Sequence, residues 1–328
     1  MRDVFGSADA VAAALEAFCR DTLGAGVAQA EFFDASVGSV HGLTLEDGRR
    51  VVVKAHAPGA SVRFLRAMQE VQRHLATGGY PCPEPLVPPT VLGAGVAVAE
   101  TLIDRGTAPN GHDPAVRRAL AAGLCDIVQR CRPLVALEGL DEHAMTVPPG
   151  ALWPTPHDRR FDFEGTSSGA EWIDRLAAEA CRIRDAASAE LVVAHSDWRV
   201  QHVRMLDEKL TAVYDWDSIM LMTEPQAVGS GAHAFTMNWE TGDLVSPSLE
   251  EMRAFVAEYE EARGRDFSPV ERRAAFGSLV YSLAYTARCQ HSDALTDFGQ
   301  QPAQPGRAVP SGGAHAMLAT HGDELLRG

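Results

Sequence analysis

Short apolar runs separated by turn residues dominate the first hundred positions. The runs at 43–45 and 51–53 flank the segment 46–49, which contains Asp47-Gly48. An Asp-Gly pair between two apolar runs predicts a β-hairpin, because glycine accepts the positive φ of a tight turn. The apolar stretch 91–103 is rich in β-branched residues and predicts another pair of strands.

Two stretches of this first part have helical spacing instead. Residues 8–23 predict an opening helix. A second helix is predicted over 60–77, where apolar residues recur every three or four positions and are followed by Gly78-Gly79 and by prolines at 81, 83 and 85. The predicted order is therefore a helix, a hairpin, a helix and more strands.

Helical patterns prevail from about residue 104 onward. An Ala/Leu/Val-rich helix is expected over 114–131, and capping boxes at 168–171, 248–251 and 268–271 predict three further helix starts. The last two helices are expected to end near 263 and 289. Short strands are predicted at 191–194, 203–206 and 210–214, and the segment 296–313, rich in Pro, Gly and Gln, predicts a mobile loop.

Composition narrows the class of protein. The chain has 328 residues, 46% of them apolar, which is enough for a large core and for two domains or lobes, and excludes a disordered protein. A net charge of −15 argues against a nucleic-acid binder, which needs a basic surface. The first 24 residues lack a signal-peptide pattern, no apolar run is long enough for a membrane span, and the six cysteines form no CxxC pair. We therefore expect a cytoplasmic protein with reduced thiols.

Two carboxylates directly follow apolar strands. Asp197 comes after the predicted strand 191–194, and Asp215 after 210–214. Side chains at strand ends lie at the rim of a sheet, where they contact a ligand without being buried in the core. A hairpin joins the two acids, so we expect them to converge. One carboxylate beside a substrate hydroxyl and another holding Mg²⁺ is the arrangement that phosphoryl transfer from ATP requires.

These segments resemble the aminoglycoside phosphotransferase and choline-kinase-like family of the protein-kinase-like fold. That family has a His-Gly-Asp-x-x-x-x-Asn loop and a later Ile-Asp-Trp-Asp/Glu strand end. Here residues 195–202 read His-Ser-Asp-Trp-Arg-Val-Gln-His, and 214–217 read Tyr-Asp-Trp-Asp. The likeness extends over most of 30–290. It implies an α+β, bilobal fold, with a small β-rich N-lobe at 1–103 and a larger, mostly helical C-lobe at 104–328 that carries the catalytic and metal loops and the substrate site.

The resemblance also implies roles for single residues in these loops. Asp197 would be the catalytic acid that positions the acceptor hydroxyl, and Asp215 the principal Mg²⁺ ligand. His202 stands at the family's metal-binding asparagine, and Ser196 at its glycine. Imidazole is a poorer Mg²⁺ ligand than an amide oxygen. The second metal position is therefore expected at His202 or Asp217.

The same resemblance places the nucleotide site in the first part of the chain. Lys54, on the return strand of the predicted hairpin, matches the kinase lysine that binds the α- and β-phosphates. The helix glutamate that pairs with this lysine in the family falls on Met68 here, and Glu70 lies nearby on another helix face, so either Glu70 or no helix acid pairs with Lys54.

Two further segments would complete the nucleotide site. The small residues of 36–40 are suited to a phosphate-covering loop, with Ser36, Gly38 and Ser39 as its contacts. The strand 96–102 would be the hinge that binds adenine, with Glu100 and Leu102 at the contact.

Several residues near these loops have two interpretations. Trp198 and Trp216 either pack in the core or stack on a substrate. Arg199 either contacts a phosphate or pairs with Asp217. The acidic residues between 250 and 261 either form a solvated helix face or hold an amino substrate.

The favoured function is an ATP-dependent, Mg²⁺-assisted phosphotransferase acting on a hydroxyl of a small metabolite or an antibiotic, with an aminoglycoside-like or other cationic acceptor among the candidates. The alternative is a kinase-shaped protein that binds nucleotide or small molecules without turnover, as His202 and the missing helix glutamate suggest. A third hypothesis is a metallohydrolase using the two loop acids with His195 and His202.

Overall fold

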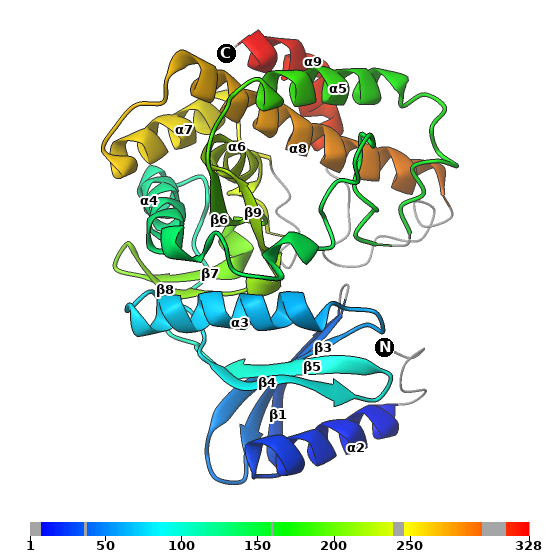
Figure 1. Ribbon diagram of the computed structural model, residues 1–328, viewed down its shortest axis with the longest axis vertical. Coiled ribbons are helices and arrows are strands. Elements are labelled where there is room, and N and C mark those ends of the chain that lie inside the picture. The colour runs from blue at the N-terminus through cyan, green and yellow to red at the C-terminus, as the bar shows by residue number, and fades with distance from the viewer. Residues whose placement is uncertain (1–7, 36–37, 159, 239–245, 297–312, 328) are drawn as a thin grey trace. The chain divides into compact units, whose positions relative to one another are not determined.

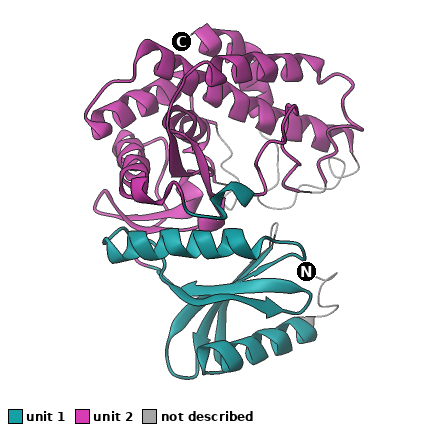
Figure 2. Ribbon diagram, in the orientation of Figure 1, with its two compact units in different colours: residues 1–104, 137–143 teal, residues 105–136, 144–328 magenta. Residues whose placement is uncertain are grey.

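The chain forms two compact units in the computed structural model (Figure 2). The structure describes residues 8–35, 38–158, 160–238, 246–296 and 313–327. Unit 1 comprises Met1–Asp104 and Leu137–His143, and unit 2 comprises Arg105–Ala136 and Ala144–Gly328. The return of 137–143 to unit 1 is a feature that the sequence does not predict.

Unit 1 is built on a five-stranded antiparallel sheet with the strand order β1-β2-β3-β5-β4 (Figure 1). Its elements are α2 (Ala8–Phe18), the π-helical turn η1 (Cys19–Leu23), β1 (Val27–Ala35), β2 (Ser39–Leu45), β3 (Arg50–His56), α3 (Val62–Thr77), β4 (Pro85–Leu92), β5 (Gly95–Thr101) and the 3-10 turn η3 (Leu140–Glu142).

The predicted hairpin is β2 and β3. The N–H of Leu45 donates to the carbonyl of Arg49 at 2.8 Å across the turn, and Gly48 has a φ of +86°, the conformation for which glycine is needed. The second predicted helix is α3, whose first turn is capped by the hydroxyl of Ser61. Strand β1 is an element that the apolar pattern does not predict.

The two helices of unit 1 cover opposite faces of the sheet (Figure 1). Leu15 and Phe18 of α2 belong to the same buried cluster as Val53 of β3 and Ala97 of β5. Because successive side chains of a strand point to opposite faces, Lys54 lies on the face away from this cluster, toward α3. This face carries the polar groups described below.

Unit 2 is mostly helical. Its elements are α4 (Pro114–Arg130), the 3-10 turn η2 (Arg132–Leu134), α5 (Glu171–Asp185), β6 (Leu191–His195), the 3-10 turn η4 (Val200–His202), β7 (Val203–Leu206), β8 (Lys209–Val213), the 3-10 turn η5 (Trp216–Ser218), β9 (Ile219–Thr223), α6 (Glu224–Ala234), α7 (Leu249–Arg263), α8 (Pro269–Leu295) and α9 (Ala314–Arg327). Helix α8 packs against α5, α6 and α9 (Figure 1). No helix among the described residues has the length and apolar character that crossing a bilayer needs.

Two of the three predicted capping boxes are present. Ser248 and Ser268 each exchange hydrogen bonds with the glutamate three residues on, at the starts of α7 and α8. The prediction of a capping box at Ser168 is wrong, because the chain turns at Gly169 with a φ of +82° and α5 begins at Glu171 without a side-chain cap. Helix α8 also continues to Leu295, beyond the expected end, and residues 297–312 of the expected loop lie outside the described residues.

Two glycines let the helices around α8 approach closely. A Cβ on Gly229 of α6 would overlap the carbonyl oxygen of Ala275, and a Cβ on Gly277 of α8 would lie 2.9 Å from that of Ala180 on α5. Glycine weakens an isolated helix, so α6 is not predicted by its sequence pattern, yet tertiary packing requires glycine here.

Two antiparallel strand pairs position the acidic loops. The hairpin β7–β8 joins Val203 to Val213, as predicted, while β9 returns beside β6 so that His195 faces Ile219. Strand β9 therefore brings the loop after β8 back to the end of β6, where the other acidic loop begins.

Candidate active site

Asp197 and Asp215 both lie two residues beyond the end of a strand, as the sequence predicts. Asp197 follows β6, and Asp215 follows β8 and precedes η5. The backbone of Asp215 is left-handed, with a φ of +61°. A non-glycine residue rarely adopts this conformation, and such residues gather at functional sites where the surrounding structure holds them.

Hydrogen bonds join the two acidic loops to each other. The N–H and the hydroxyl of Ser196 both donate to the carbonyl of Ser218, each at 2.8 Å, and the hydroxyl of Ser218 donates to Oδ2 of Asp215 at 2.7 Å. Nε2 of His195 lies 2.9 Å from the carbonyl of Tyr214. These contacts are not apparent from the sequence, although a serine in place of the family's glycine is the signal for the first.

The two tryptophans of the loops are core residues. Trp198 and Trp216 are fully buried, and their indole N–H groups donate to the carbonyls of Leu120 and Val213 at 3.0 and 2.8 Å. The ring of His195 packs edge-on against both. Of the two interpretations, the structure favours packing over contact with a substrate.

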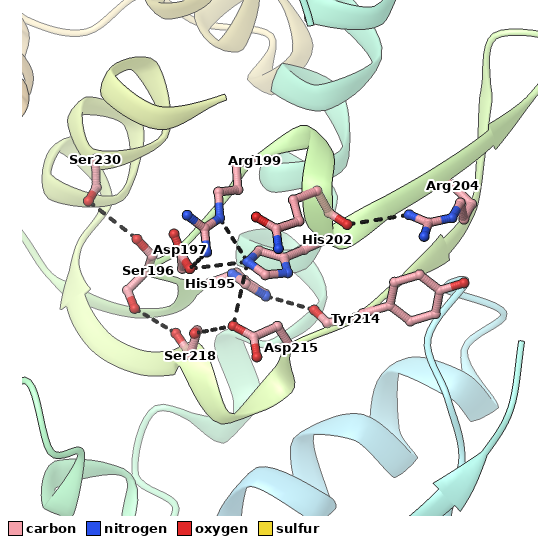
Figure 3. A network of polar contacts seen from close by, with 11 residues as sticks. His195, Ser196, Asp197, Arg199, His202, Arg204, Tyr214, Asp215, Ser218 and Ser230 are labelled. Atoms are coloured by element: carbon pink, nitrogen blue, oxygen red, sulfur yellow. Dashed lines mark hydrogen bonds and ion pairs between the residues drawn. The ribbon is translucent and has the colours of Figure 1, made fainter. Parts of the chain in front are cut away.

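A compact polar cluster surrounds the two carboxylates (Figure 3). Oδ2 of Asp197 lies 2.8 Å from Nη2 of Arg199 and 3.1 Å from Nε2 of His202, and that nitrogen lies 3.7 Å from Oδ2 of Asp215. Arg199 therefore pairs with Asp197, a partner that the sequence analysis does not name.

Arg199 also determines the role of the His202 ring. Nε of Arg199 donates to Nε2 of His202 at 2.9 Å. Because a guanidinium nitrogen is always a donor, this imidazole nitrogen is the acceptor and its lone pair is engaged. In this arrangement His202 holds the guanidinium against Asp197 rather than offering a lone pair to a cation.

Electrostatics keep Asp197 ionised. Burial, the largest single influence, opposes the charge of this carboxylate, but the charge of Arg199 and the contacts with His202 and His195 together outweigh burial, so the pKa of Asp197 lies well below its ordinary value. Burial lowers the pKa of His195, whose Nε2 is engaged by Tyr214 and whose Nδ1 has no hydrogen-bond partner within the described part of the chain. Asp197 is therefore a permanent hydrogen-bond acceptor at neutral pH, and His195 is a neutral part of the scaffold.

Three side chains of the cluster could hold a metal ion. One ligand atom each of Asp197, His202 and Asp215 lie within 4.8 Å of one another. Asp217, expected as a metal ligand, is not part of this group; it lies in η5, beyond the sharp turn at Asp215. The assignment of His202 or Asp217 to the second metal position stays a prediction.

On the α3 face of the sheet in unit 1, Lys54 pairs with an acid. Nζ of Lys54 lies 3.4 Å from Oε1 of Glu100, and both side chains are buried. Glu70, the helix acid considered as a partner, instead pairs with Arg73 at the surface. Glu100, expected at an adenine contact, carries the counter-charge of the lysine.

The remaining nucleotide contacts stay predictions. Ser36 lies outside the described residues. A Cβ on Gly38 would lie 2.6 Å from the carbonyl of Ala55, which explains the small residue, and the buried hydroxyl of Ser39 lies 3.0 Å from Nε2 of His41. The N–H of Leu102 donates to the carbonyl of Arg50 at 3.0 Å, so this group is used within the sheet.

Comparison with known proteins supports this assembly of loops. The model of a family described as the phosphotransferase enzyme family matches residues 42–264, more than half of the chain. The chain belongs to this family. No curated protein matches the phosphotransferase by sequence.

Solved structures share the fold of this phosphotransferase. An amicoumacin kinase in complex with AMP-PNP, Ca²⁺ and Ami is 12% identical, with a TM-score of 0.59 over 91% of this chain and 88% of that one. The aminoglycoside phosphotransferase APH(4)-Ia is 16% identical (TM-score 0.55; 96% and 98% covered). A choline/ethanolamine kinase family protein from Mesorhizobium loti is also 16% identical (TM-score 0.54; 98% and 99%). The fold is therefore α+β and protein-kinase-like.

The acids of α7 in this phosphotransferase are largely engaged in internal pairs. Glu258 binds Arg117 through two hydrogen bonds of 2.9 Å, Glu260 binds Arg272, and Glu251 caps its own helix. These three carboxylates therefore have a structural role.

Proposed function

We propose that the chain is a small-molecule kinase that transfers the γ-phosphate of ATP to a hydroxyl group with the assistance of Mg²⁺. The observation that carries this proposal is the convergence of Asp197 and Asp215 on one imidazole, at the ends of two strands whose loops are hydrogen-bonded together. Two carboxylates with separate environments suit the two tasks of orienting the acceptor and binding the metal.

Asp197 is the residue proposed to position the acceptor. Its low pKa keeps it ionised, so it accepts a hydrogen bond from the hydroxyl and directs the oxygen's lone pair at the phosphorus. Arg199 binds one oxygen of this carboxylate, Oδ2, and fixes its orientation, and His202 in turn accepts a hydrogen bond from Arg199.

Asp215 is the proposed metal ligand, with Asp197 beside it. The donor set fits Mg²⁺ through its carboxylate oxygens, which are the hard ligands that this ion prefers. The ion would neutralise charge on the phosphate oxygens. The left-handed backbone and the hydroxyl of Ser218 hold the Asp215 carboxylate in place.

Unit 1 supplies the proposed nucleotide contacts. The ammonium of Lys54 would bind the α- and β-phosphates, and Gly38 and Ser39 would contribute backbone contacts. Leu102 would contribute its carbonyl oxygen, because its N–H donates to the carbonyl of Arg50. The use of ATP is supported by the AMP-PNP that the similar amicoumacin kinase structure contains. For the acceptor we propose a hydroxylated metabolite or antibiotic, without a requirement for positive charge, because the α7 acids described above are already paired.

An ATP-consumption assay over a panel of hydroxylated metabolites and antibiotics tests the proposal, with wild-type protein compared with Asp197→Ala. Acceptor-dependent consumption is expected only in the wild type. Equal background turnover in both proteins, with every acceptor, would contradict it.

A second candidate is a kinase-shaped protein that binds nucleotide without transferring phosphate. The ion pair between Arg199 and Asp197 favours it, because it occupies an oxygen of the proposed catalytic carboxylate. Thermal-shift titrations with nucleotide, with and without Mg²⁺, separate the two. A Mg²⁺-dependent shift favours the kinase, whereas metal-independent binding without turnover favours the binding protein.

A further inference from the structure

We propose that Glu100, on strand β5, is the positioning residue of Lys54, so that the sheet itself supplies the counter-charge for the nucleotide-binding lysine and helix α3 does not. The inference rests on the proposed function, because it gives Lys54 a phosphate-binding role. It concerns the residues of unit 1 alone.

The strand register brings the two side chains together. Lys54 of β3 is opposite Val98 of β5, and Val52 is opposite Glu100, so Lys54 and Glu100 are diagonal neighbours on the same face of the sheet. Nζ and Oε1 lie 3.4 Å apart, and the exposed fractions of the two side chains are 9% and 4%. Such a buried pair is screened little by solvent, so each charge strongly influences the position of the other.

Helix α3 contributes a neutral group to this pair. Nε2 of Gln72 donates to Oε2 of Glu100 at 2.8 Å, and Gln72 is itself buried. Oε2 is thus held by the helix while Oε1 faces the lysine. Two other polar residues of α3 are engaged elsewhere: Glu70 binds Arg73, and Gln69 donates to the carbonyl of Val87.

This arrangement has a consequence for the lysine. Both Lys54 and Glu100 are fixed by hydrogen-bonded neighbouring strands, so the ammonium keeps its position as long as the sheet is intact. Loss of the Glu100 charge would remove this buried counter-charge and weaken the restraint that it places on the ammonium. Glu100 acts through Lys54, which makes the coupling between the two residues the quantity to measure.

A double-mutant cycle on nucleotide binding measures that coupling. The affinity for a non-hydrolysable ATP analogue with Mg²⁺ is determined by calorimetry for the wild type, Glu100→Gln, Lys54→Met and the double variant. We expect Glu100→Gln to weaken binding about tenfold in the wild-type background and by less than about twofold when Lys54 is already Met. Denaturant unfolding confirms that each variant is folded.

Two further variants keep the test decisive. Glu70→Gln, which removes a surface acid of α3, is the matched control and should bind the analogue as the wild type does. Gln72→Leu removes the hydrogen bond to Glu100 without changing a charge and serves if Glu100→Gln does not fold. It should weaken binding by a smaller factor that again disappears in the Lys54→Met background.

The outcomes separate this inference from the proposed function. Equal losses from Glu100→Gln in both backgrounds, or a loss from Glu70→Gln alone, would overturn the inference while phosphate transfer by the wild type stands. Coupled losses in a protein that binds the analogue but phosphorylates no acceptor would support the inference and contradict the proposed function. A wild type that binds no nucleotide would overturn both.

Discussion

Nη2 of Arg199 lies 2.8 Å from Oδ2 of Asp197, two residues before it in the chain. The proposed catalytic carboxylate is therefore paired with a cation from its own loop. The pair favours the ionised form of the carboxylate. The same guanidinium also donates to His202, so Arg199 links the carboxylate to the imidazole.

The first prediction concerns this pair. Arg199→Met removes the largest of the interactions that together outweigh burial, so the pKa of Asp197 rises, and the acid limb of the kcat/KM profile moves to higher pH. The pH dependence of transfer checks this. Arg204→Met is the matched control, because Arg204 contacts backbone carbonyls and the Tyr214 ring instead. An acid limb that stays where the wild type has it would show that Arg199 does not govern Asp197.

The second prediction concerns the metal. Nε2 of His202 is engaged by Arg199, so the imidazole adds little to metal binding, whereas the amide oxygen of His202→Asn is a hard donor for Mg²⁺. We expect the Mg²⁺ concentration for half-maximal activity to fall severalfold in the variant. A Mg²⁺ titration of the transfer rate measures it. A rise in that concentration would identify the histidine as a metal ligand.

The third prediction concerns acid stability. Burial of the imidazole lowers the pKa of His233 to about 4, against about 6.5 in an unfolded chain. Below pH 6.5 the unfolded state takes up a proton that the folded state refuses until about pH 4. Stability from this group is thus complete above 6.5 and falls by up to about 3 kcal/mol as the pH drops to 4.

His233→Gln keeps an amide that can bond to Thr286 but cannot titrate. The free energy of unfolding of this variant should fall less steeply between pH 6.5 and 4 than that of the wild type. Denaturant titrations across this range provide the measurement, with exposed His74→Gln as the control. Identical slopes for wild type and His233→Gln would refute the assignment.

The fourth prediction concerns a buried ion pair between the start of α6 and the end of α7. Nη2 of Arg263 lies 2.7 Å from Oε2 of Glu224, and the hydroxyl of Tyr259 donates to the other carboxylate oxygen. Arg263→Met leaves a buried carboxylate without its cation and should cost about 3 kcal/mol or more of unfolding free energy. The exposed pair of Arg253 with Glu324 is the control, and Arg253→Met should cost less than about 1 kcal/mol. Similar costs in both variants would contradict this account.

The sequence predicts those elements whose determining residues lie close together in the chain. The turn at Gly48 and the capping boxes at Ser248 and Ser268 depend on residues within a few positions of one another, so their patterns are sufficient. The box at Ser168 has the same letters but fails, because the chain turns at Gly169 before the helix begins. Helix α6, in contrast, is present but not predicted, because Gly229 lowers the local helix propensity while allowing close contact with α8.

The site divides in the same way. The positions of Asp197 and Asp215 at the site can be predicted, because the apolar pattern predicts the strands and side chains at strand ends are accessible to a ligand. The partners of the site residues cannot be predicted from the sequence, because they depend on strand register and side-chain rotamers. Arg199 pairs with Asp197 through its rotamer, and Glu100 contacts Lys54 only because β5 pairs with β3. The hydrogen bonds from Ser196 to the carbonyl of Ser218 likewise depend on the pairing of β9 with β6.

Transfer of label from γ-labelled ATP to an acceptor hydroxyl, compared between wild type and Asp197→Asn, tests the central claim most directly. Asparagine keeps the size of the side chain but cannot accept the hydroxyl proton. We expect kcat to fall about 10²- to 10⁴-fold, while the affinity for the Mg²⁺–nucleotide complex changes little. Labelled product formed at the wild-type rate by Asp197→Asn would contradict the account.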